Sequence, residues 1–366
     1  MKFFNDSFDE IVQKIANIEK SRIAIGKKLR EINEKFKIGP NEEIFDEKLI
    51  NSVETFDKKT SVVGIDGGIV KSSLHGLDLI LTRAVAVNFV YNDGKIENVF
   101  YYPSSNPQPN SQIIVDSLSE IEIGSCYNFV RQIMEIETAI ESIKTIKPDL
   151  ALLDGSVVPH YISKPDNPFL KEYYKKLIEK YKELFNTAEN EKCILAGVIE
   201  DSRSNKFCDI LIRRVSHVFQ DDVFKEMAFI LSKTRDTNLL YYLLEKGERT
   251  CIFNYSQNQE MHPLLKEFSK TSSNFLSFYL KTVEFDRPLR IDFVAKDKQI
   301  EIANEICNII MKTSGHSGYG LPAILIEADQ RAKLSQKDLD LFYLDLINKV
   351  GNLPSLFKLR RENRPF

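Results

Sequence analysis

Two aspartates stand where a carboxylate could do chemistry. Asp66 follows the β-rich run SVVGI and precedes two glycines, and Asp154 follows the apolar run LALL and precedes Gly155. If these runs are neighbouring parallel strands, both acids emerge at the same edge of a sheet, which is where α/β folds build their sites. An Asp-Gly pair is also an ordinary turn signal, so neither pair is specific by itself.

A glutamate between these aspartates is the third candidate. Its helix is predicted from isoleucines at helical spacing: Ile133, Ile136, Ile140 and Ile143. At roughly 100° per residue, Glu137 lies about 80° from the centre of that stripe, whereas Glu135 and Glu141 lie about 120° away, towards solvent. Glu137 is therefore the acid expected nearest the protein body. The alternative is a boundary glutamate that extends into water.

The fourth candidate comes late in the chain. The segment GYGLPAILIEADQRAKL carries Glu327 and Asp329 on the opening turns of a helix expected to start near Pro322. Acids in the first turns of a helix commonly offset its dipole, which is the alternative to a role in a site.

Together, Asp66, Glu137, Asp154 and Asp329 offer only oxygen ligands. Such hard ligands suit Mg²⁺ or Mn²⁺ rather than zinc. Two such ions can activate water and stabilise the leaving oxygen in phosphodiester hydrolysis. An Asp-Glu-Asp-Asp set on strand, helix, strand and late helix is the arrangement that such a catalytic site requires.

The elements around these acids predict an α/β fold. Three β-rich runs, 61–66, 77–92 and 95–102, should form an antiparallel meander, with the first run broken after Asp66 by the two glycines. A helix through Phe129 and Ile143 and a buried strand ending at Asp154 follow. That strand is expected to be parallel to the first. Two helices close the chain, one at 299–311 and one starting near Leu321.

The composition describes a globular chain. Its 366 residues are 43% hydrophobic and 28% charged, which excludes wholesale disorder. Fifty basic residues against 53 acidic ones give a formal charge of -3. This balance excludes a nucleic-acid binder that relies on bulk positive charge. It does not exclude nucleic acid held locally, in a groove.

The sequence also bears on compartment. No apolar run reaches the ~18 residues of a membrane span, and an N-terminus that turns acidic at Asp6 is not a signal peptide. The five cysteines are scattered without a CxxC pair, which argues against a disulfide framework or a zinc site. We expect a cytoplasmic protein without membrane contact.

Several segments, in order along the chain, resemble the motifs of the NurA nucleases, a family with an RNase H-like core. VVGIDGG, with Asp66, is similar to the first acidic motif of that family, and IETAIE and LLDGS, with Glu137 and Asp154, are similar to the second and third. LAGVIEDSRS, GERTCIF, RPLRIDF and YGLPAILIEADQRAKL resemble later segments. The resemblance runs from about Val62 to Leu334.

The resemblance implies roles for these residues. Asp66, Glu137 and Asp154 would hold two Mn²⁺ or Mg²⁺ ions, and Asp329 stands where the family commonly has histidine. Glu200 stands where the family usually has lysine, so Arg203 or Lys206 would have to supply that positive charge. The groups expected to contact DNA are Arg203, Lys206, Arg213, Arg214 and Tyr319.

The resemblance also implies an architecture. We expect an RNase H-like mixed sheet, with three antiparallel strands and then parallel strands, flanked by helices and extended by helical additions at the N-terminus and in the middle. The expected division is an N-terminal helical segment (1–50), a nuclease domain (51–350) with helical insertions at about 155–190 and 207–247, and a basic tail (351–366).

The implied function is a metal-dependent DNA nuclease for end resection in DNA repair, acting as an exonuclease, an endonuclease or both. The family's members act as homodimers with a hexameric HerA-type ATPase. Two alternatives remain open from the sequence. One is a catalytically silent adaptor that docks on a ring ATPase, and the other is an RNase H-like ribonuclease.

Overall fold

The computed structural model describes residues 6–35, 43–92, 94–159, 164–214, 221–258, 261–268 and 275–360. Parts of the predicted N-terminal segment, of both predicted insertions and of the predicted tail lie outside these ranges. The chain divides into two compact units. Unit 1 comprises Met1–Phe56, Val198–Gln257 and Asn274–Pro322, and unit 2 comprises Asp57–Gly197, Asn258–Ser273 and Ala323–Phe366.

Unit 2, which carries the four candidate acids, is built on a mixed sheet. Its strands are β2 (Thr60–Ser73), β3 (Asp78–Asn92), β4 (Lys95–Tyr102), β5 (Asn110–Ile114), β6 (Leu150–Asp154) and the start of β7 (Ile194–Ile199). The order across the sheet is β7–β6–β2–β3–β4, and β5 also pairs with β3. Its helices are α2 (Glu120–Ile146), α3 (Pro168–Asn190), α8 (Ala323–Ala332) and α9 (Gln336–Val350), with short 3₁₀ helices at Leu265–Phe268 and Pro354–Leu356.

The pairing of these strands confirms the predicted fold class. β2, β3 and β4 are successive antiparallel neighbours. β6 lies parallel to β2 on its other side, with Val62 opposite Leu150 and Ile65 opposite Leu153. The sheet is therefore the expected RNase H-like one, in which an antiparallel meander is followed by a parallel strand.

One expectation about β2 is wrong. The strand does not end at Asp66 but continues through both glycines to Ser73, paired with β3 along its whole length. The glycines serve close packing instead of a turn. A Cβ on Gly67 would lie 3.1 Å from the Glu135 Cβ of α2, and one on Gly68 would lie 2.2 Å from the Ala332 carbonyl oxygen of α8. Asp66 is thus a mid-strand residue.

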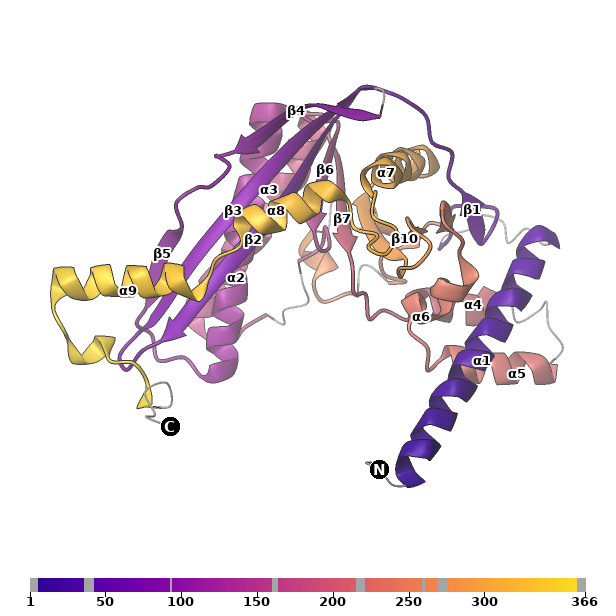
Figure 1. Ribbon diagram of the computed structural model, residues 1–366, viewed down its shortest axis with the longest axis horizontal. Coiled ribbons are helices and arrows are strands. Elements are labelled where there is room, and N and C mark those ends of the chain that lie inside the picture. The colour runs from indigo at the N-terminus through magenta and orange to yellow at the C-terminus, as the bar shows by residue number, and fades with distance from the viewer. Residues whose placement is uncertain are drawn as a thin grey trace. The chain divides into compact units, whose positions relative to one another are not determined.

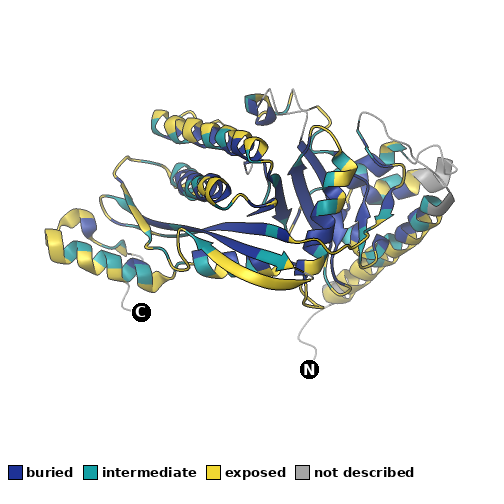
Figure 2. Ribbon diagram, turned by 90° about the horizontal axis from the view of Figure 1, so that it is seen from above, coloured by how far each residue is buried: buried dark blue, intermediate teal, exposed yellow. Residues whose placement is uncertain are grey.

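Helices cover both faces of this sheet. α2 packs on β2 and β3, and α3 packs on α2, whereas α8 lies across β2 and β3 on the opposite face (Figure 1). Figure 2 shows the resulting burial: the inner strands β3 and β6 are mostly buried, β4 and β5 are mostly exposed, and the outer sides of the helices are exposed. α2 begins at a capping box formed by Ser119 and Glu122 and ends before Pro148, where Lys147 is left-handed.

The C-terminal part of unit 2 also differs from expectation. The two predicted closing helices are three, namely α7 (Gln299–Thr313) in unit 1 and α8 and α9 in unit 2. The chain leaves the helical conformation after Ala332, and Ser335 starts α9 by accepting a hydrogen bond from the Asp338 N–H. The capping signal was present in the sequence, because Ser335 and Asp338 form a capping box.

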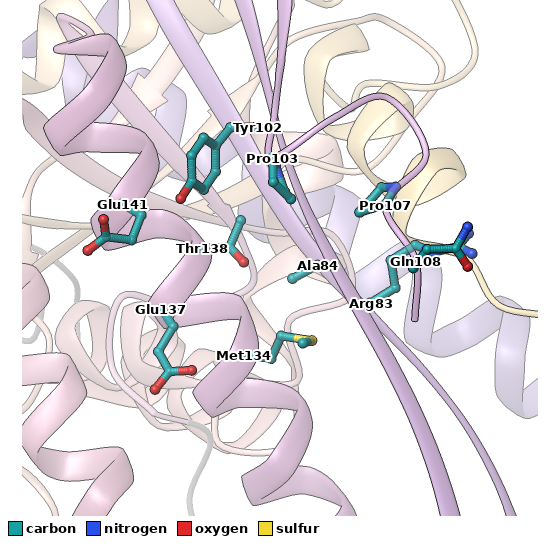
Figure 3. Close-up of a pocket in the computed structure, with 10 residues that line it drawn as sticks. All are labelled: Arg83, Ala84, Tyr102, Pro103, Pro107, Gln108, Met134, Glu137, Thr138 and Glu141. Atoms are coloured by element: carbon teal, nitrogen blue, oxygen red, sulfur yellow. The ribbon is translucent and has the colours of Figure 1, made fainter. Parts of the chain in front are cut away.

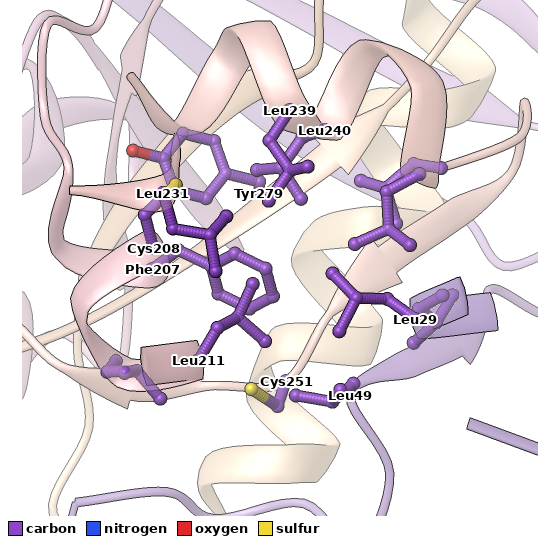
Figure 4. Close-up of a cluster of buried hydrophobic side chains, with 14 of the residues drawn as sticks. Leu29, Leu49, Phe207, Cys208, Leu211, Leu231, Leu239, Leu240, Cys251 and Tyr279 are labelled. Atoms are coloured by element: carbon purple, nitrogen blue, oxygen red, sulfur yellow. The ribbon is translucent and has the colours of Figure 1, made fainter. Parts of the chain in front are cut away.

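Unit 1 holds the N-terminal helix and the helices within the insertion predicted at 207–247, whereas the helix within the insertion predicted at 155–190, α3, belongs to unit 2. Besides α7, the elements of unit 1 are α1 (Asp6–Lys35), α4 (Lys206–Arg214), α5 (Asp221–Leu231), α6 (Asp236–Leu243), β1 (Ile50–Ser52), β8 (Glu248–Thr250), β9 (Phe253–Asn254), β10 (Phe275–Lys281) and β11 (Leu289–Val294). The strands lie in the order β1–β8–β10–β11, and β9 pairs with β10. Leu29, Phe207, Leu240 and Tyr279 belong to one buried cluster that gives this unit its own core (Figure 4).

Within the described ranges, every helix is too short or too polar to cross a bilayer. The segment boundaries predicted at residues 50 and 350 remain predictions.

The close approach of α8 to Gly68 predicts that an alanine substitution has different effects on stability at Gly68 and at Gly124. We expect Gly68→Ala to lower the free energy of unfolding by ~1–3 kcal/mol, because the new methyl group would overlap the end of α8. Gly124→Ala is the matched control: it lies in α2 with open space around it, and alanine should stabilise that helix by ~0.5–1 kcal/mol. Urea unfolding measures both. Equal effects of the two substitutions would contradict this packing.

Candidate functional site

Asp66 and Asp154 lie side by side on neighbouring strands. β2 and β6 are parallel and in register up to Ile65 and Leu153, so the next residue on each strand is an aspartate. β6 ends at Asp154, whereas β2 runs on. After Asp154, the chain turns at Gly155, whose φ of 113° is one that L side chains rarely adopt. The two carboxylates therefore stand at a step in the sheet edge.

Asp66 is almost completely buried, with 7% of its surface exposed. Its Oδ1 accepts a hydrogen bond of 2.7 Å from the Gly67 N–H. Burial raises the pKa of the Asp66 carboxyl, although the Gly67 N–H and the positive charge of Arg131 oppose the shift. The negative charge of Asp329 adds to the increase. The positive charge of Arg131 therefore does not fully offset the effect of burial on the Asp66 carboxylate.

Asp329, on the late helix α8, acts electrostatically on Asp66. Side chains alternate between the two faces of a strand, so Asp66 shares the face of Gly68, which packs against α8. Asp329 is an exposed residue of α8, and its charge acts on Asp66. The late helix therefore brings a carboxylate close to the first strand, as the four-acid arrangement requires.

The expectation that Glu137 is the acid of this helix, α2, nearest the protein body is wrong. Glu137 keeps 40% of its side-chain surface exposed, and its Oε1 lies 3.3 Å from Lys176 Nζ and 3.7 Å from Lys180 Nζ of α3. Glu135 is the buried one, at 5% exposure, and it packs on Gly67. The isoleucine stripe misled because α2 is buried twice, against the sheet and against α3, so the stripe's centre does not point at the sheet.

Glu135 belongs to the acid group electrostatically. Its Oε2 accepts a hydrogen bond of 2.8 Å from Arg131 Nη1, which also lies 3.3 Å from the Gly67 carbonyl oxygen. Burial raises the pKa of Glu135 to about 8; Arg131 lowers it, and the charges of Asp66 and Asp154 raise it further. We use the name acid cluster for Asp66, Glu135, Asp154 and Asp329.

The sequence reasoning missed two of these functional candidates, Glu135 and Arg131. They form an i,i+4 ion pair on α2. Such a pair usually marks a solvated helix face. A signal was nevertheless available, because a helix next to a Gly-Gly strand can bring a side chain onto the backbone at the glycine.

The chemistry of the acid cluster fits a divalent cation of the hard type. All four groups are carboxylates, and two of them have raised pKa values because their negative charge is buried. Among the described residues, no three histidine, cysteine, aspartate or glutamate side chains are placed so that they could hold a metal ion together. The residue types thus fit such an ion, but their placement does not yet enclose one, since Glu135 is paired with Arg131.

The five predicted DNA contacts all lie in unit 1. Arg203 is exposed. Lys206 donates to the Tyr255 carbonyl oxygen, and burial together with Arg290 lowers its pKa to about 8. The ion pairs of Arg213 and Arg214 are with Glu43. The Tyr319 hydroxyl lies 3.2 Å from both carboxylate oxygens of Glu200.

Comparisons with known proteins identify relatives of this chain. Residues 60–334 match a family model described as the NurA domain. The crystal structure of the NurA nuclease from Sulfolobus solfataricus is similar over 96% of this chain and 100% of that one, at 16% identity and a TM-score of 0.59. A structure of NurA with manganese is similar over 95% and 99%, at 13% identity and a TM-score of 0.49. No curated protein matches this chain.

The raised pKa of Glu135 predicts a pH dependence of stability. Folding lifts this pKa from its ordinary value of 4.5 to about 8, so the folded state binds more protons than the unfolded state between these values. The free energy of unfolding of metal-free protein should therefore fall as pH rises from about 5 to about 8, by at least ~1 kcal/mol. Glu135→Gln should flatten this slope, because an amide does not titrate.

Urea unfolding at several pH values, with a chelator present, measures the effect. Glu137→Gln on the same helix is the matched control and should keep the wild-type slope. A slope unchanged by Glu135→Gln would show that another group controls it.

Proposed function

The chain belongs to the NurA family of nucleases, and we propose that it is a Mn²⁺- or Mg²⁺-dependent DNA nuclease that resects DNA ends by exonucleolytic or endonucleolytic cleavage. One observation carries the proposal. Asp66 lies next to Asp154 at the edge of a mixed sheet, the charge of Asp329 acts on Asp66, and the charges of Asp66 and Asp154 act on Glu135. A phosphodiester is cleaved at such sites by water that metal ions activate.

We assign metal binding and catalysis to Asp66, Glu135, Asp154 and Asp329, with Glu135 in the place first expected for Glu137. Two ions bound there would supply the attacking hydroxide and stabilise the leaving oxygen. Asp66 and Asp154 are held by the sheet, and Asp329 is held by α8. Arg131 compensates the charge of Glu135 and Asp66, so that the acids can lie together before a metal binds.

The proposed DNA contacts remain Arg203, Lys206, Arg213, Arg214 and Tyr319. Their support is chemical: guanidinium and ammonium groups bind phosphate, and a half-exposed tyrosine can stack on a base. Tyr319 is 41% exposed. Its hydrogen bond to Glu200 and the Glu43 pairing of Arg213 and Arg214 would have to open for these groups to meet DNA.

We further propose a cytoplasmic homodimer that works with a hexameric HerA-type ATPase in DNA repair. The support within the chain is an exposed apolar stripe on the first turns of α1, formed by Phe8, Ile11, Val12, Ile15 and Ile18. Further along α1, Ile25 and Leu29 are buried, and the helix packs on α6. The same side of α1 is therefore buried in its second half and exposed on its first turns, and such an exposed apolar stretch is suited to a protein partner.

The nuclease proposal is tested with purified protein, Mn²⁺ and labelled single- and double-stranded DNA. We expect cleavage by the wild type, and a loss of at least ~100-fold in Asp66→Ala and in Asp154→Ala, because each substitution removes a ligand. Cleavage that survives both substitutions would overturn the site. Preferred cleavage of an RNA competitor would favour the ribonuclease.

Calorimetry with Mn²⁺ tests which of Glu135 and Glu137 binds the metal. It also distinguishes a metal-dependent nuclease from a silent adaptor. Glu135→Gln should weaken Mn²⁺ binding, while Glu137→Gln should leave it close to that of the wild type. No Mn²⁺ uptake by the wild type would favour the silent adaptor.

The exposed stripe of α1 predicts the dimer contact. We expect the double substitution Ile11→Asp with Ile15→Asp to convert a dimer into a monomer, because it places two charges in an apolar contact. Lys14→Asp is the matched control, since it changes charge on an exposed position of the same helix without removing apolar surface. Sedimentation velocity gives the mass. A wild-type monomer, or a dimer that persists in the double variant, would refute this contact.

A further inference from the structure

One edge of β2 is left open over the stretch that begins at Asp66. β6 pairs with this edge only as far as Ile65. Beyond the end of β2, the segment around Lys358 takes over, since Leu74 forms a β-bridge with Lys358. Among the described residues, no strand pairs with the side of residues 66–73 that faces away from β3. We use the name open edge for this side of residues 66–73.

The backbone of the open edge points its polar groups outwards. The Gly67 N–H donates to Asp66 Oδ1, and the Gly67 carbonyl oxygen accepts from Arg131 Nη1. Both groups therefore point away from β3. Alternate residues of a strand direct their backbone groups to the same side, so the N–H groups of Ile69 and Lys71 also point outwards. Backbone N–H groups are common ligands of phosphate oxygens.

Helices on both faces of the sheet accompany the open edge. On one face, α2 places Glu135 against Gly67 and Tyr127 beside Lys71, whose Nζ lies 4.1 Å from the centre of the tyrosine ring. On the other face, α8 ends beside Gly68 and α9 packs on β2. The open edge therefore leads away from the acid cluster with a helix on either side.

A pocket of about 600 Å³ lies at the far end of the open edge. Its lining includes Lys71 and Ser73 of β2, Tyr127 of α2 and Asp340 of α9. Helices on opposite faces of a sheet can line one pocket only at its margin, and on β2 that margin is the open edge. From Asp66 to Lys71 the strand extends about 17 Å. The acid cluster and the pocket are thus two places along one strand edge.

Two lysines determine which ligand suits this pocket. Lys71 rests on the Tyr127 ring, and no carboxylate among the described residues is paired with it. The ring is held in place because the Tyr127 hydroxyl donates a hydrogen bond of 3.0 Å to Asp78 Oδ1. Lys358 supplies a second ammonium group, 3.7 Å from Asp340 Oδ1. Ammonium groups and outward backbone N–H groups favour a phosphate.

The pocket also accounts for a glycine in α2. A Cβ on Gly124 would meet no atom within 4 Å, although glycine weakens a helix interior relative to alanine. Close packing explains Gly67 and Gly68 but not Gly124. Gly124 lines the pocket, where the missing side chain leaves room for a ligand. Glu120, also in the lining, lies in the first turn of α2, where a carboxylate offsets the helix dipole.

α2 lines another pocket, of about 250 Å³, on its side away from β6. Figure 3 shows Glu137 and Glu141 of α2 among its walls. Their carboxylates disfavour a phosphate there, because like charges repel. The pocket at the open edge is therefore the better place for a nucleotide.

We propose that the pocket at the open edge binds a nucleotide of the DNA strand that is cut at the acid cluster, away from the scissile bond, with a phosphate held by Lys71 and Lys358. The inference rests on the proposed function for the identity of the strand. It adds a DNA-binding site within unit 2, on the same strand edge as the acid cluster, to the five contacts expected in unit 1.

The test measures the binding of a labelled single strand of about 12 nucleotides by fluorescence anisotropy, with Ca²⁺ in place of Mn²⁺. Lys71→Gln should weaken binding at least ~5-fold and make the slope of log affinity against log salt shallower by ~0.7, because one phosphate contact is lost. Lys175→Gln, at an exposed lysine of α3, is the matched control and should bind as the wild type does.

A dinucleotide tests the position of the pocket along the strand. It is too short to reach from the acid cluster to Lys71, so its affinity, measured by competition with the labelled strand, should be the same in Lys71→Gln as in the wild type.

Gly124→Gln tests whether the glycine leaves room for a ligand. Glutamine favours a helix more than glycine does, so this variant should unfold at a higher urea concentration than the wild type. Its side chain would fill part of the pocket, so binding of the labelled strand should weaken at least ~3-fold. A purely structural glycine would not change stability and binding in opposite directions.

Binding that is unchanged in Lys71→Gln or in Gly124→Gln would overturn this site. An equal loss of affinity for the dinucleotide in Lys71→Gln, or no binding of the labelled strand by the wild type, would overturn it too. These readings do not require cleavage. Failure of the nuclease proposal shows separately, as no cleavage by the wild type or as cleavage that survives Asp66→Ala and Asp154→Ala.

Discussion

The close approach of two helices to one strand is the constraint on which the candidate site depends. α2 and α8 lie on opposite faces of β2, and each comes near its backbone where a side chain is missing, at Gly67 and Gly68. Any Cβ at these positions would push a helix outwards, because well-packed interiors have no spare volume. Since Glu135 is on α2 and Asp329 is on α8, the two glycines bring acids from both faces close to Asp66. The acid cluster follows from backbone packing before any metal is considered.

That packing has an electrostatic cost, which the surrounding residues offset in part. Asp66 and Glu135 are buried, and their pKa values are raised because burial and neighbouring acids disfavour their charged forms. Arg131 offsets part of this charge. Its Nη1 donates hydrogen bonds to Glu135 Oε2 and to the Gly67 carbonyl oxygen, which holds the guanidinium beside both acids. A stable fold with this cluster therefore needs either retained protons, the guanidinium, or cations from solution. A divalent cation offsets the most charge, which is consistent with a metal-dependent enzyme.

α2 carries two glutamates in different surroundings. Glu135 lies on the sheet, where Arg131 offsets its buried charge only in part, whereas Glu137 is half-exposed and is paired with lysines of α3. A chain with a formal charge of -3 has no bulk attraction for DNA. Recognition in such a protein must be local.

The order of elements, the antiparallel meander, the parallel strand ending at Asp154 and the proximity of Asp66 to Asp154 could all be predicted from the sequence. These features depend on local patterns, namely period-two strands, turn residues and a single buried run between helices. The length of β2 and the identity of the helix acid could not be predicted. A Gly-Gly pair reads as a break unless the neighbours that fill its space are known, and an isoleucine stripe points to the sheet only when a helix has a single buried side. α3 and α8 supply those missing contacts from distant parts of the chain, so only the tertiary structure decided that β2 continues and that Glu135 faces inwards.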